Sequence, residues 1–143
     1  MDPDKRAPRV LVAASGSGGH LMPARYIIEA LQSLHPDAKV EFVGSGRVLE
    51  GTIIDPTGIT RHIIHTVGIK RRGIKGFLEF LLTTPKAVFR TVKLFRSLRP
   101  DVVIGVGGYV TFFPVTLAFL FRIPRWIHEA ERKPGLATYV LSF

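Results

Sequence analysis

The sequence predicts an α/β fold in which helices cover a parallel, doubly wound sheet. Short apolar segments of strand length alternate with longer segments whose apolar residues recur at helical spacing. This alternation is typical of strand, helix, strand units, which join parallel strands by right-handed crossovers. The chain has 143 residues, of which 46% are hydrophobic, and this is enough to bury one core. We therefore expect a single domain over residues 1–143.

The first half of the chain contains three of the expected strands. Residues 9–14 are the first strand, and a glycine loop separates it from an amphipathic helix at residues 24–34. Residues 40–43 and 59–66 are the second and third strands, and a short helix at residues 47–54 lies between them. We expect two successive strand–helix units here.

The second half begins with a long helical segment that contains a proline. Its apolar residues keep helical spacing across Pro85, so we expect two helical pieces that meet at this residue. Residues 101–105 are rich in β-branched residues and predict a strand buried on both faces. A short apolar helix at residues 112–121 and a fifth strand at residues 125–128 follow. Residues 135–143 open another helix, and because they end on an apolar stretch without a cap, we expect further chain downstream.

Residues 102–121 form a run of twenty residues without a charge, which is the length of a membrane-spanning helix. Glycines at positions 105, 107 and 108 interrupt the run, and a proline follows at position 114. A strand, a glycine turn and a helix therefore explain the run better than one continuous span. The chain has no cysteine and shows no secretory signal, which fits a reducing compartment.

Positive charge is concentrated in one segment of the chain. The net charge is +9, and residues 70–99 alone carry nine basic residues against one acid, or +8. Such a segment indicates an anionic partner, either nucleic acid or an anionic membrane surface. Apolar side chains lie between the cations, which favours lipid because a nucleic-acid duplex offers little apolar surface. The alternative is that these apolar side chains belong to the core and the cations to a solvated helix face.

A glycine-rich turn follows the first strand and reads Ser15-Gly16-Ser17-Gly18-Gly19-His20. Its glycines allow a ligand to approach the backbone, and the free amides of the next helix favour an anion such as a diphosphate. Leu21 stands where a dinucleotide-binding turn needs glycine, and no Gly-Lys-Ser or Gly-Lys-Thr of a P-loop follows. We therefore expect no nicotinamide cofactor. The alternative role of the glycines is tight packing alone.

Two further turns are expected at the same edge of the sheet. Gly105-Val106-Gly107-Gly108-Tyr109 follows the buried strand, and its glycines either hold a second phosphate or permit close helix packing. Polar residues follow the fifth strand, where Glu129 either contacts sugar hydroxyls or belongs to an exposed loop. His20 ends the first turn, where an imidazole is suited to take a proton from a sugar hydroxyl, unless it is a structural loop residue.

Taken together, these turns resemble the amino-terminal domain of the MurG family. That family carries motifs close to Gly-Gly-Thr-Gly-Gly-His, Gly-Gly-Tyr-Val-Ser-Gly-Pro and His-Glu-Gln-Asn, in this order. The matching segments here are residues 15–20, 107–113 and 128–131, and the resemblance also takes in residues 68–76 and 100–105. It spans essentially the whole chain. This sequence departs from the family pattern with Thr-Phe-Phe for Ser-Gly-Pro at positions 111–113 and Ala-Glu for Gln-Asn at positions 130 and 131.

The resemblance implies the first Rossmann-like domain of a two-domain GT-B glycosyltransferase of peptidoglycan synthesis. The acceptor would be a lipid-linked sugar diphosphate, and N-acetylglucosamine would pass to it with inversion from UDP-N-acetylglucosamine bound by a second domain. His20 and Glu129 would be the catalytic residues, and no cofactor or metal is expected. The implied acceptor diphosphate site comprises Ser17, Gly18, Gly19, Gly107, Gly108 and Tyr109.

The resemblance also implies a peripheral protein on the cytoplasmic face of the cell membrane, with a part in cell-wall biogenesis, cell shape and division. The alternative is a non-catalytic membrane-docking subunit of a split glycosyltransferase. In either case the chain alone is expected to be inactive. The expected membrane-binding residues are Ile69, Lys70, Arg71, Arg72, Ile74, Lys75, Phe77, Phe80 and Leu81.

Overall fold

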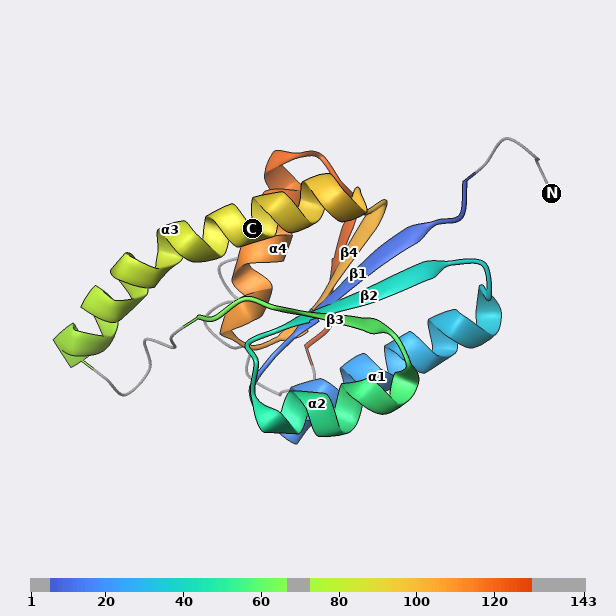
Figure 1. Cartoon of the computed structure of the whole chain (residues 1–143), viewed down its shortest axis with the longest axis horizontal. Helices are drawn as coiled ribbons and strands as arrows, with labels where there is room; N and C mark the ends of the chain where they lie inside the picture. Colours follow the sequence, from blue (N-terminus) through green and yellow to red (C-terminus); the bar gives the residue numbers. More distant parts are fainter. Residues whose placement is uncertain (1–5, 67–72, 130–143) are drawn as a thin grey trace.

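The computed structural model describes the chain as an α/β/α sandwich, in which a parallel sheet lies between two layers of helices (Figure 1). It describes residues 6–66 and 73–129, and the side chains of residues 73–81 are not described. The α/β class with a doubly wound parallel sheet, which the sequence predicts, is confirmed.

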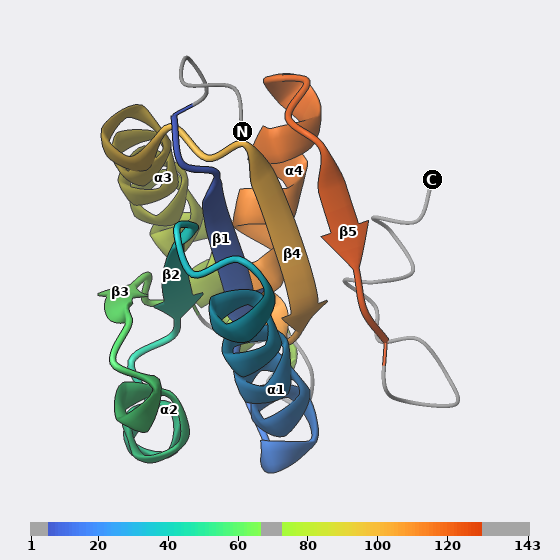
Figure 2. The same ribbon diagram turned by 90° about the vertical axis from the view of Figure 1, so that its right-hand side faces the viewer.

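The sheet has five strands in the order β3-β2-β1-β4-β5, and all neighbouring strands are parallel. All carboxyl ends therefore lie at the same edge of the sheet (Figure 2). The strand order reverses between β1 and β4, and sheets of this kind bind ligands beyond the carboxyl ends at such a point. The strands are β1 (Arg9–Ala14), β2 (Lys39–Gly44), β3 (Thr60–Ile63), β4 (Val102–Gly107) and β5 (Arg125–Ile127).

Two helices cover each face of the sheet (Figure 1). Helices α1 (Gly18–Leu34) and α2 (Val48–Ile54) lie on one face, and α3 (Gly73–Leu98) and α4 (Phe112–Leu120) lie on the other. Two short 3-10 helices, η1 (Asp55–Thr57) and η2 (Tyr109–Thr111), follow α2 and precede α4.

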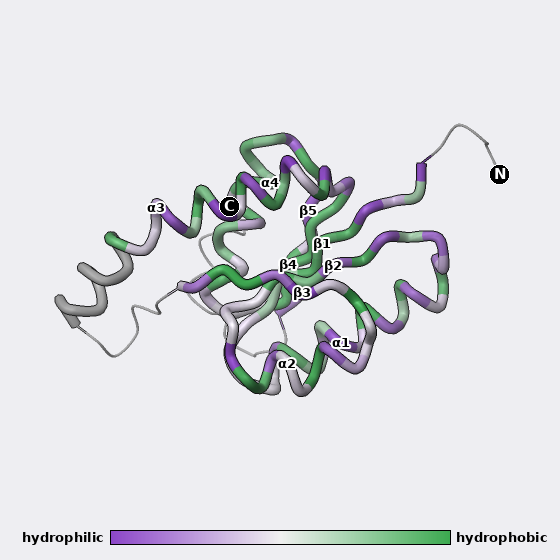
Figure 3. Tube along the Cα trace, viewed as in Figure 1, coloured by the Kyte–Doolittle hydropathy of each residue, from purple (hydrophilic) through white to green (hydrophobic). Residues whose placement is uncertain are grey.

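The core has two halves because side chains of a strand point alternately to its two faces. Leu11 of β1 packs with Phe95 of α3 on one face, whereas Val12 packs with Ile28 of α1 on the other. Both β1 side chains are fully buried, and most of β1 is coloured hydrophobic in Figure 3. Apolar burial of this kind is the main contribution to the stability of the sheet.

Helix α1 begins earlier than its apolar pattern predicts. We expected its start near residue 24, but the helix begins at Gly18 and contains Pro23. Proline lacks a backbone N–H and removes one hydrogen bond of the helix, here the bond to the carbonyl of Gly19. The early start places His20 in the first helical turn rather than at the end of a loop.

The expectation that the long helical segment divides at Pro85 is wrong. Helix α3 runs as one element of 26 residues through this position. Pro85 is exposed, so its ring projects away from the sheet and the helix loses one backbone hydrogen bond on its solvent side. The carboxyl-terminal half packs on the sheet through Ala87, Phe95 and Leu98, while the amino-terminal turns extend beyond the carboxyl edge of the sheet (Figure 1).

The uncharged run at residues 102–121 forms β4, η2 and α4 before the turn at Phe121, so the prediction of a strand, a turn and a helix is confirmed. Among the residues that the structure describes, no helix is long and apolar enough to cross a membrane. The helix expected at residues 135–143 lies outside the described residues.

Candidate functional site

The turns after β1 and β4 form one unit at the point where the strand order reverses. The backbone N–H of Ser15 donates to the carbonyl of Gly107 at 3.0 Å, and the Ser15 hydroxyl accepts from the N–H of Val110 at 3.4 Å. The Thr111 hydroxyl lies 3.1 Å from the carbonyl of Ala13 and 2.8 Å from that of Gly107. These contacts hold the two glycine turns side by side.

His20 lies between the two glycine turns. Its imidazole packs on the backbone of Gly107, and a Cβ atom at that position would lie 2.7 Å from the Nε2 atom of His20. Gly107 also has a φ of +117°, which side-chain-bearing residues rarely adopt. The lack of a side chain at Gly107 therefore allows the ring of His20, the predicted catalytic histidine, to pack closely on the backbone.

The Nδ1 atom of His20 is buried and has no hydrogen-bond partner among the described residues. The backbone N–H of His20 donates to the carbonyl of Ser17 at 3.1 Å, and this bond helps to fix the side chain in the first turn of α1. Buried polar atoms without a partner are uncommon in native structures and often have a functional reason. The histidine is thus held in place by packing while one ring nitrogen is left unsatisfied.

The structure brings most of the predicted diphosphate site together. Ser17 and Gly19 are exposed, and a Cβ atom at Gly18 would meet nothing within 4 Å, so the start of α1 is open on this side. Gly108 and Tyr109 follow β4 at the same edge and are partly buried. Figure 2 shows the amino-terminal end of α1 at the carboxyl edge of the sheet.

Glu129 lies at the same edge but on the far side of the second glycine turn. It follows β5, whose pairing with β4 is continued by a bond of 2.7 Å from the N–H of His128 to the carbonyl of Gly105. Glu129 is partly buried. The two positions at which this sequence departs from His-Glu-Gln-Asn, 130 and 131, lie outside the described residues.

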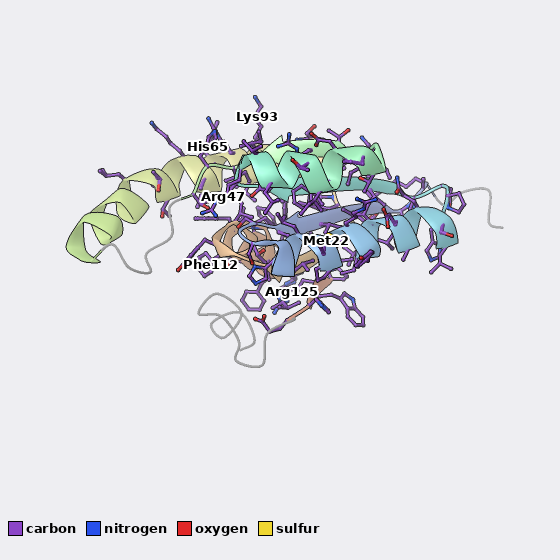
Figure 4. All side chains as sticks on the ribbon, turned by 90° about the horizontal axis from the view of Figure 1, so that it is seen from below. Met22, Arg47, His65, Lys93, Phe112 and Arg125 are labelled. Atoms are coloured by element: carbon purple, nitrogen blue, oxygen red, sulfur yellow. The ribbon has the colours of Figure 1, made fainter. Side chains whose placement is uncertain are left out.

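A further loop at this edge was missed by the sequence reasoning. Residues 45–47 follow β2, which is the direct neighbour of β1. The fully buried carboxyl group of Glu50 accepts a hydrogen bond from the N–H of Gly46 in this loop. Arg47 and His65 lie at the same end of the molecule as Phe112 in Figure 4. A glutamate at the third position of a short helix can accept hydrogen bonds from the free amides that precede the helix, and Glu50 could have drawn attention to this loop.

The described part of α3 exposes both apolar and basic side chains. Leu82 is 75% exposed and Phe89 is 70% exposed, and they lie seven residues apart on one side of the helix. The side chains of Lys86, Arg90 and Lys93 are exposed around them. Of the predicted membrane-binding residues, positions 69–72 lie outside the described residues, and the side chains of Ile74, Lys75, Phe77, Phe80 and Leu81 on α3 are not described.

The shifted pKa values of the described residues belong to side chains of β2, β3 and η1. Burial opposes ionisation of Glu41, but hydrogen bonds from Lys39 and His62 outweigh it and hold the pKa of Glu41 below its ordinary value. A hydrogen bond from Arg61 lowers the pKa of Asp55 in the same way. In the described ranges, no three His, Cys, Asp or Glu residues lie close enough together to hold a metal ion.

Comparison with protein families identifies the chain. Residues 10–143 match the model of the glycosyltransferase family 28 N-terminal domain. The chain belongs to glycosyltransferase family 28. The resemblance to the MurG family, which the three turns carry, is thereby confirmed at the level of the family, and the matched region of the family 28 domain includes both glycine turns and Glu129.

Several curated relatives of this family 28 domain are named UDP-N-acetylglucosamine--N-acetylmuramyl-(pentapeptide) pyrophosphoryl-undecaprenol N-acetylglucosamine transferase. A relative from Anaeromyxobacter sp. (strain Fw109-5) is 38% identical over 134 residues, which cover 94% of the chain and 35% of the relative. A relative from Desulforudis audaxviator is 41% identical over 135 residues, which cover 94% of the chain and 36% of the relative. The family 28 chain therefore spans about a third of the length of these relatives.

Solved structures agree with the fold of the family 28 domain. The crystal structure of Acinetobacter baumannii MurG is similar over 94% of the chain and 39% of the MurG chain, with a TM-score of 0.79 and 27% identity. The spinosyn rhamnosyltransferase SpnG is similar in fold with a TM-score of 0.62 at 18% identity, covering 92% of the chain and 37% of SpnG. The predicted Rossmann-like, GT-B type of domain is confirmed.

Proposed function

We propose that this chain is the acceptor-binding half of an inverting glycosyltransferase that acts in peptidoglycan synthesis. The donor would be UDP-N-acetylglucosamine and the acceptor a lipid-linked N-acetylmuramyl-pentapeptide diphosphate, as the names of the curated relatives suggest. A second domain, outside the 143 residues, would bind the donor. The chain would then contribute the acceptor site and the base.

The observation that carries this proposal is the position of His20 between the two glycine turns. In the proposed reaction an acceptor hydroxyl attacks C1 of N-acetylglucosamine, a new C–O bond forms, and the bond from C1 to the UDP oxygen breaks. UDP leaves with the bonding electrons, and the imidazole of His20 takes the hydroxyl proton. Packing against Gly107 supports this role because it restricts the ring to one orientation before the substrate binds.

The open start of α1 supports a diphosphate site beside His20. Helix α1 has 17 residues, and the amides of its first turn carry partial positive charge toward the carboxyl edge of the sheet. These amides are accessible because the residues at this end of the helix, Ser17, Gly18 and Gly19, have no large side chains. The same space is bordered by Gly107, Gly108 and Tyr109. Glu129 would act from the β5 side, where a carboxylate can accept a hydrogen bond from a sugar hydroxyl.

We further propose that the chain binds an anionic membrane surface through α3 and the segment that precedes it. Exposed Leu82 and Phe89 next to three lysine and arginine side chains support this proposal, and so does the extension of α3 beyond the edge that holds the site (Figure 1). Apolar side chains enter the lipid headgroup region, and nearby cations are attracted to anionic lipids. A lipid-linked acceptor would then meet the site at its own interface, on the cytoplasmic face of the membrane.

The acceptor assignment is tested by titration of the chain with each proposed substrate. The probes are a short-chain lipid-linked N-acetylmuramyl-pentapeptide diphosphate and UDP-N-acetylglucosamine, and the readout is the NMR shift of backbone amides at residues 15–20 and 107–111. We expect saturable shifts with the acceptor analogue and little or no change with the sugar nucleotide. Saturation by the sugar nucleotide alone would assign this half to the donor and contradict the proposal.

The exposed surface of α3 also favours a second candidate function, a non-catalytic subunit that only docks a separate transferase chain on the membrane. The two functions differ at His20. A docking subunit would keep its membrane affinity and its effect on the partner chain after His20→Ala, whereas the acceptor half of an enzyme would lose turnover.

A further inference from the structure

Glu50 is a fully buried carboxyl group that the proposed reaction does not use. It lies in the first turn of α2 and has a relative exposure of 0%. Buried carboxyl groups are costly unless polar partners surround them, so their positions generally have a structural or functional reason. Here all the partners belong to one short loop at the substrate edge of the sheet.

The carboxyl group of Glu50 accepts hydrogen bonds from every residue of the loop after β2. The N–H of Ser45 donates to Oε1 at 3.1 Å, and the N–H groups of Gly46 and Arg47 donate to Oε2 at 2.7 Å and 3.3 Å. The hydroxyl of Ser45 donates to Oε1 as well. One side chain thus fixes the backbone of residues 45–47.

Close packing restricts the loop of residues 45–47 on two sides. A Cβ atom at Gly44 would lie 2.8 Å from the ring of Phe42 and would also overlap the Glu50 carboxyl group, so the glycine makes room for the buried acid. On the other side, a Cβ atom at Gly46 would lie 2.8 Å from Ile63 and 3.2 Å from the imidazole of His65. The loop is therefore held between Glu50 and the end of β3.

The loop lies next to the first glycine turn. Strands β1 and β2 are direct neighbours, with Ala13 opposite Val43, so Ser15 and Ser45 begin their loops at the same level of the sheet. Neighbouring strands are about 5 Å apart, so the loops that follow β1 and β2 lie side by side at the same edge of the sheet. A ligand at the first glycine turn would have the loop of residues 45–47 beside it.

Arg47 lies on the loop at the substrate edge and has no acidic partner among the described residues, a feature that it shares with arginines elsewhere on the surface such as Arg122. Arg6 pairs with Asp101, Arg25 with Glu29, and Arg61 with Asp55. Arg47 is exposed, and none of the ion pairs among the described residues includes it. A guanidinium binds phosphate and carboxylate groups with paired hydrogen bonds, so an unpaired arginine at a substrate edge is suited to an oxyanion.

We propose that Glu50 is a positioning residue that fixes residues 45–47 so that Arg47 binds an oxyanion of the acceptor. The proposal rests on the proposed function, since it takes the acceptor to occupy the edge beside the first glycine turn. The oxyanion is either a phosphate of the diphosphate or a carboxylate of the peptide. Glu50 itself does not touch the substrate, because its carboxyl group is enclosed below the loop.

The test measures the dissociation constants of two probes for the 143-residue chain. One probe is geranyl diphosphate, and the other is a short-chain lipid-linked N-acetylmuramyl-pentapeptide diphosphate. The variants are Arg47→Gln, Glu50→Gln and their combination. Arg122→Gln is the matched control, since it removes the same charge from an exposed site between α4 and β5, at the opposite edge of the sheet.

We expect Arg47→Gln to raise the dissociation constant about tenfold, as the loss of a charge-assisted hydrogen bond predicts, and Arg122→Gln to leave it unchanged. An effect on both probes assigns the oxyanion to the diphosphate, and an effect on the peptide-bearing probe alone assigns it to a carboxylate. Glu50→Gln should weaken binding in the wild-type background but add little to Arg47→Gln, because it acts through Arg47. Hydrogen exchange at Ser45 and Gly46 should become faster in Glu50→Gln while Phe42 and Val43 stay protected.

Unchanged affinity in Arg47→Gln, or an equal effect of Glu50→Gln with and without Arg47, would overturn the proposal. If Glu50→Gln does not fold, Arg47→Gln and Ser45→Ala carry the test, since Ser45→Ala removes one hydrogen bond of the loop from a partly exposed residue. A wild-type chain that binds neither probe would overturn both this proposal and the proposed function. A wild-type chain that binds, with variants that bind equally well, would overturn this proposal alone.

Discussion

The imidazole of His20 occupies the space that a side chain at Gly107 would need, so the two glycine turns meet through this one contact. The contact joins residues 87 positions apart in the sequence, from the first turn of α1 and the last residue of β4. It has a consequence for stability as well as for chemistry, because neither residue can change without affecting the other.

Gly107→Ala is expected to destabilise the domain by about 1–3 kcal/mol, since it adds a strained backbone and an overlap with His20. The measurement is the free energy of unfolding in urea. His20→Ala in the same chain should recover part of this loss, because it removes the overlap but leaves the strained backbone. Strictly additive effects of the two substitutions would show that the contact is not as close as the structure describes.

His20→Ala in the assembled enzyme should lower turnover by roughly a hundredfold or more, which is the usual range for the loss of a general base. The affinity for the acceptor should change much less than the rate. The fold should survive, and a single cooperative unfolding transition of the variant is the control for this point. An unchanged rate with a folded variant would reduce His20 to a structural residue of the turn.

Glu41 gives the domain a defined sensitivity to acid. Its pKa in the folded state lies below the ordinary value of 4.5, so its contribution to stability is present above that pH and is lost as the pH falls through the lowered pKa. We expect the unfolding free energy to fall more steeply with decreasing pH below about 4 in the wild type than in Glu41→Gln. Parallel pH profiles for the two proteins would contradict the role of the contacts with Lys39 and His62.

The membrane proposal is tested by co-sedimentation of the chain with phosphatidylglycerol and phosphatidylcholine vesicles at low and high salt. We expect binding to the anionic vesicles, weakened by salt and lowered roughly tenfold or more by Lys70→Glu with Arg72→Glu, since each cation contributes about 1 kcal/mol. Phe80→Ser and Phe89→Ser should weaken binding as well. Leu34→Ser is the matched control, because Leu34 is 74% exposed at the far end of α1. If the chain binds neither the anionic nor the neutral vesicles, the proposal is wrong.

The strands could be predicted closely because their apolar runs are short and bounded by glycine, proline or charge. The prediction for β1 matches residue for residue, and the other strands differ from their predicted ends by a few residues. The two errors in the helices both involve proline. The first helix was expected to begin at residue 24, just after Pro23, and the long helical segment was expected to divide at Pro85. Each proline lies inside a helix whose packing on the sheet outweighs the loss of one hydrogen bond.

Most of the candidate site could be predicted from sequence because glycine marks two of its turns. The turns at residues 15–20 and 105–109 carry clear patterns, and their meeting at one edge follows from the parallel sheet. The contact between His20 and Gly107 could not be foreseen, because it depends on the neighbouring positions of β1 and β4. Glu50 was missed for a related reason, since a single glutamate on a short helix gives no sign of burial.

The most direct test of the central claim is glycosyl transfer by the chain alone and by a chimera. In the chimera, the 143 residues replace the corresponding part of the Desulforudis audaxviator relative, which keeps the remainder of its own length. With UDP-N-acetylglucosamine and a short-chain lipid-linked acceptor, we expect no transfer by the chain alone and measurable transfer by the chimera, lost on His20→Ala. Transfer by the isolated chain, or a folded chimera that binds UDP-N-acetylglucosamine yet transfers to no lipid-linked acceptor, would contradict the claim that this chain is the acceptor-binding half.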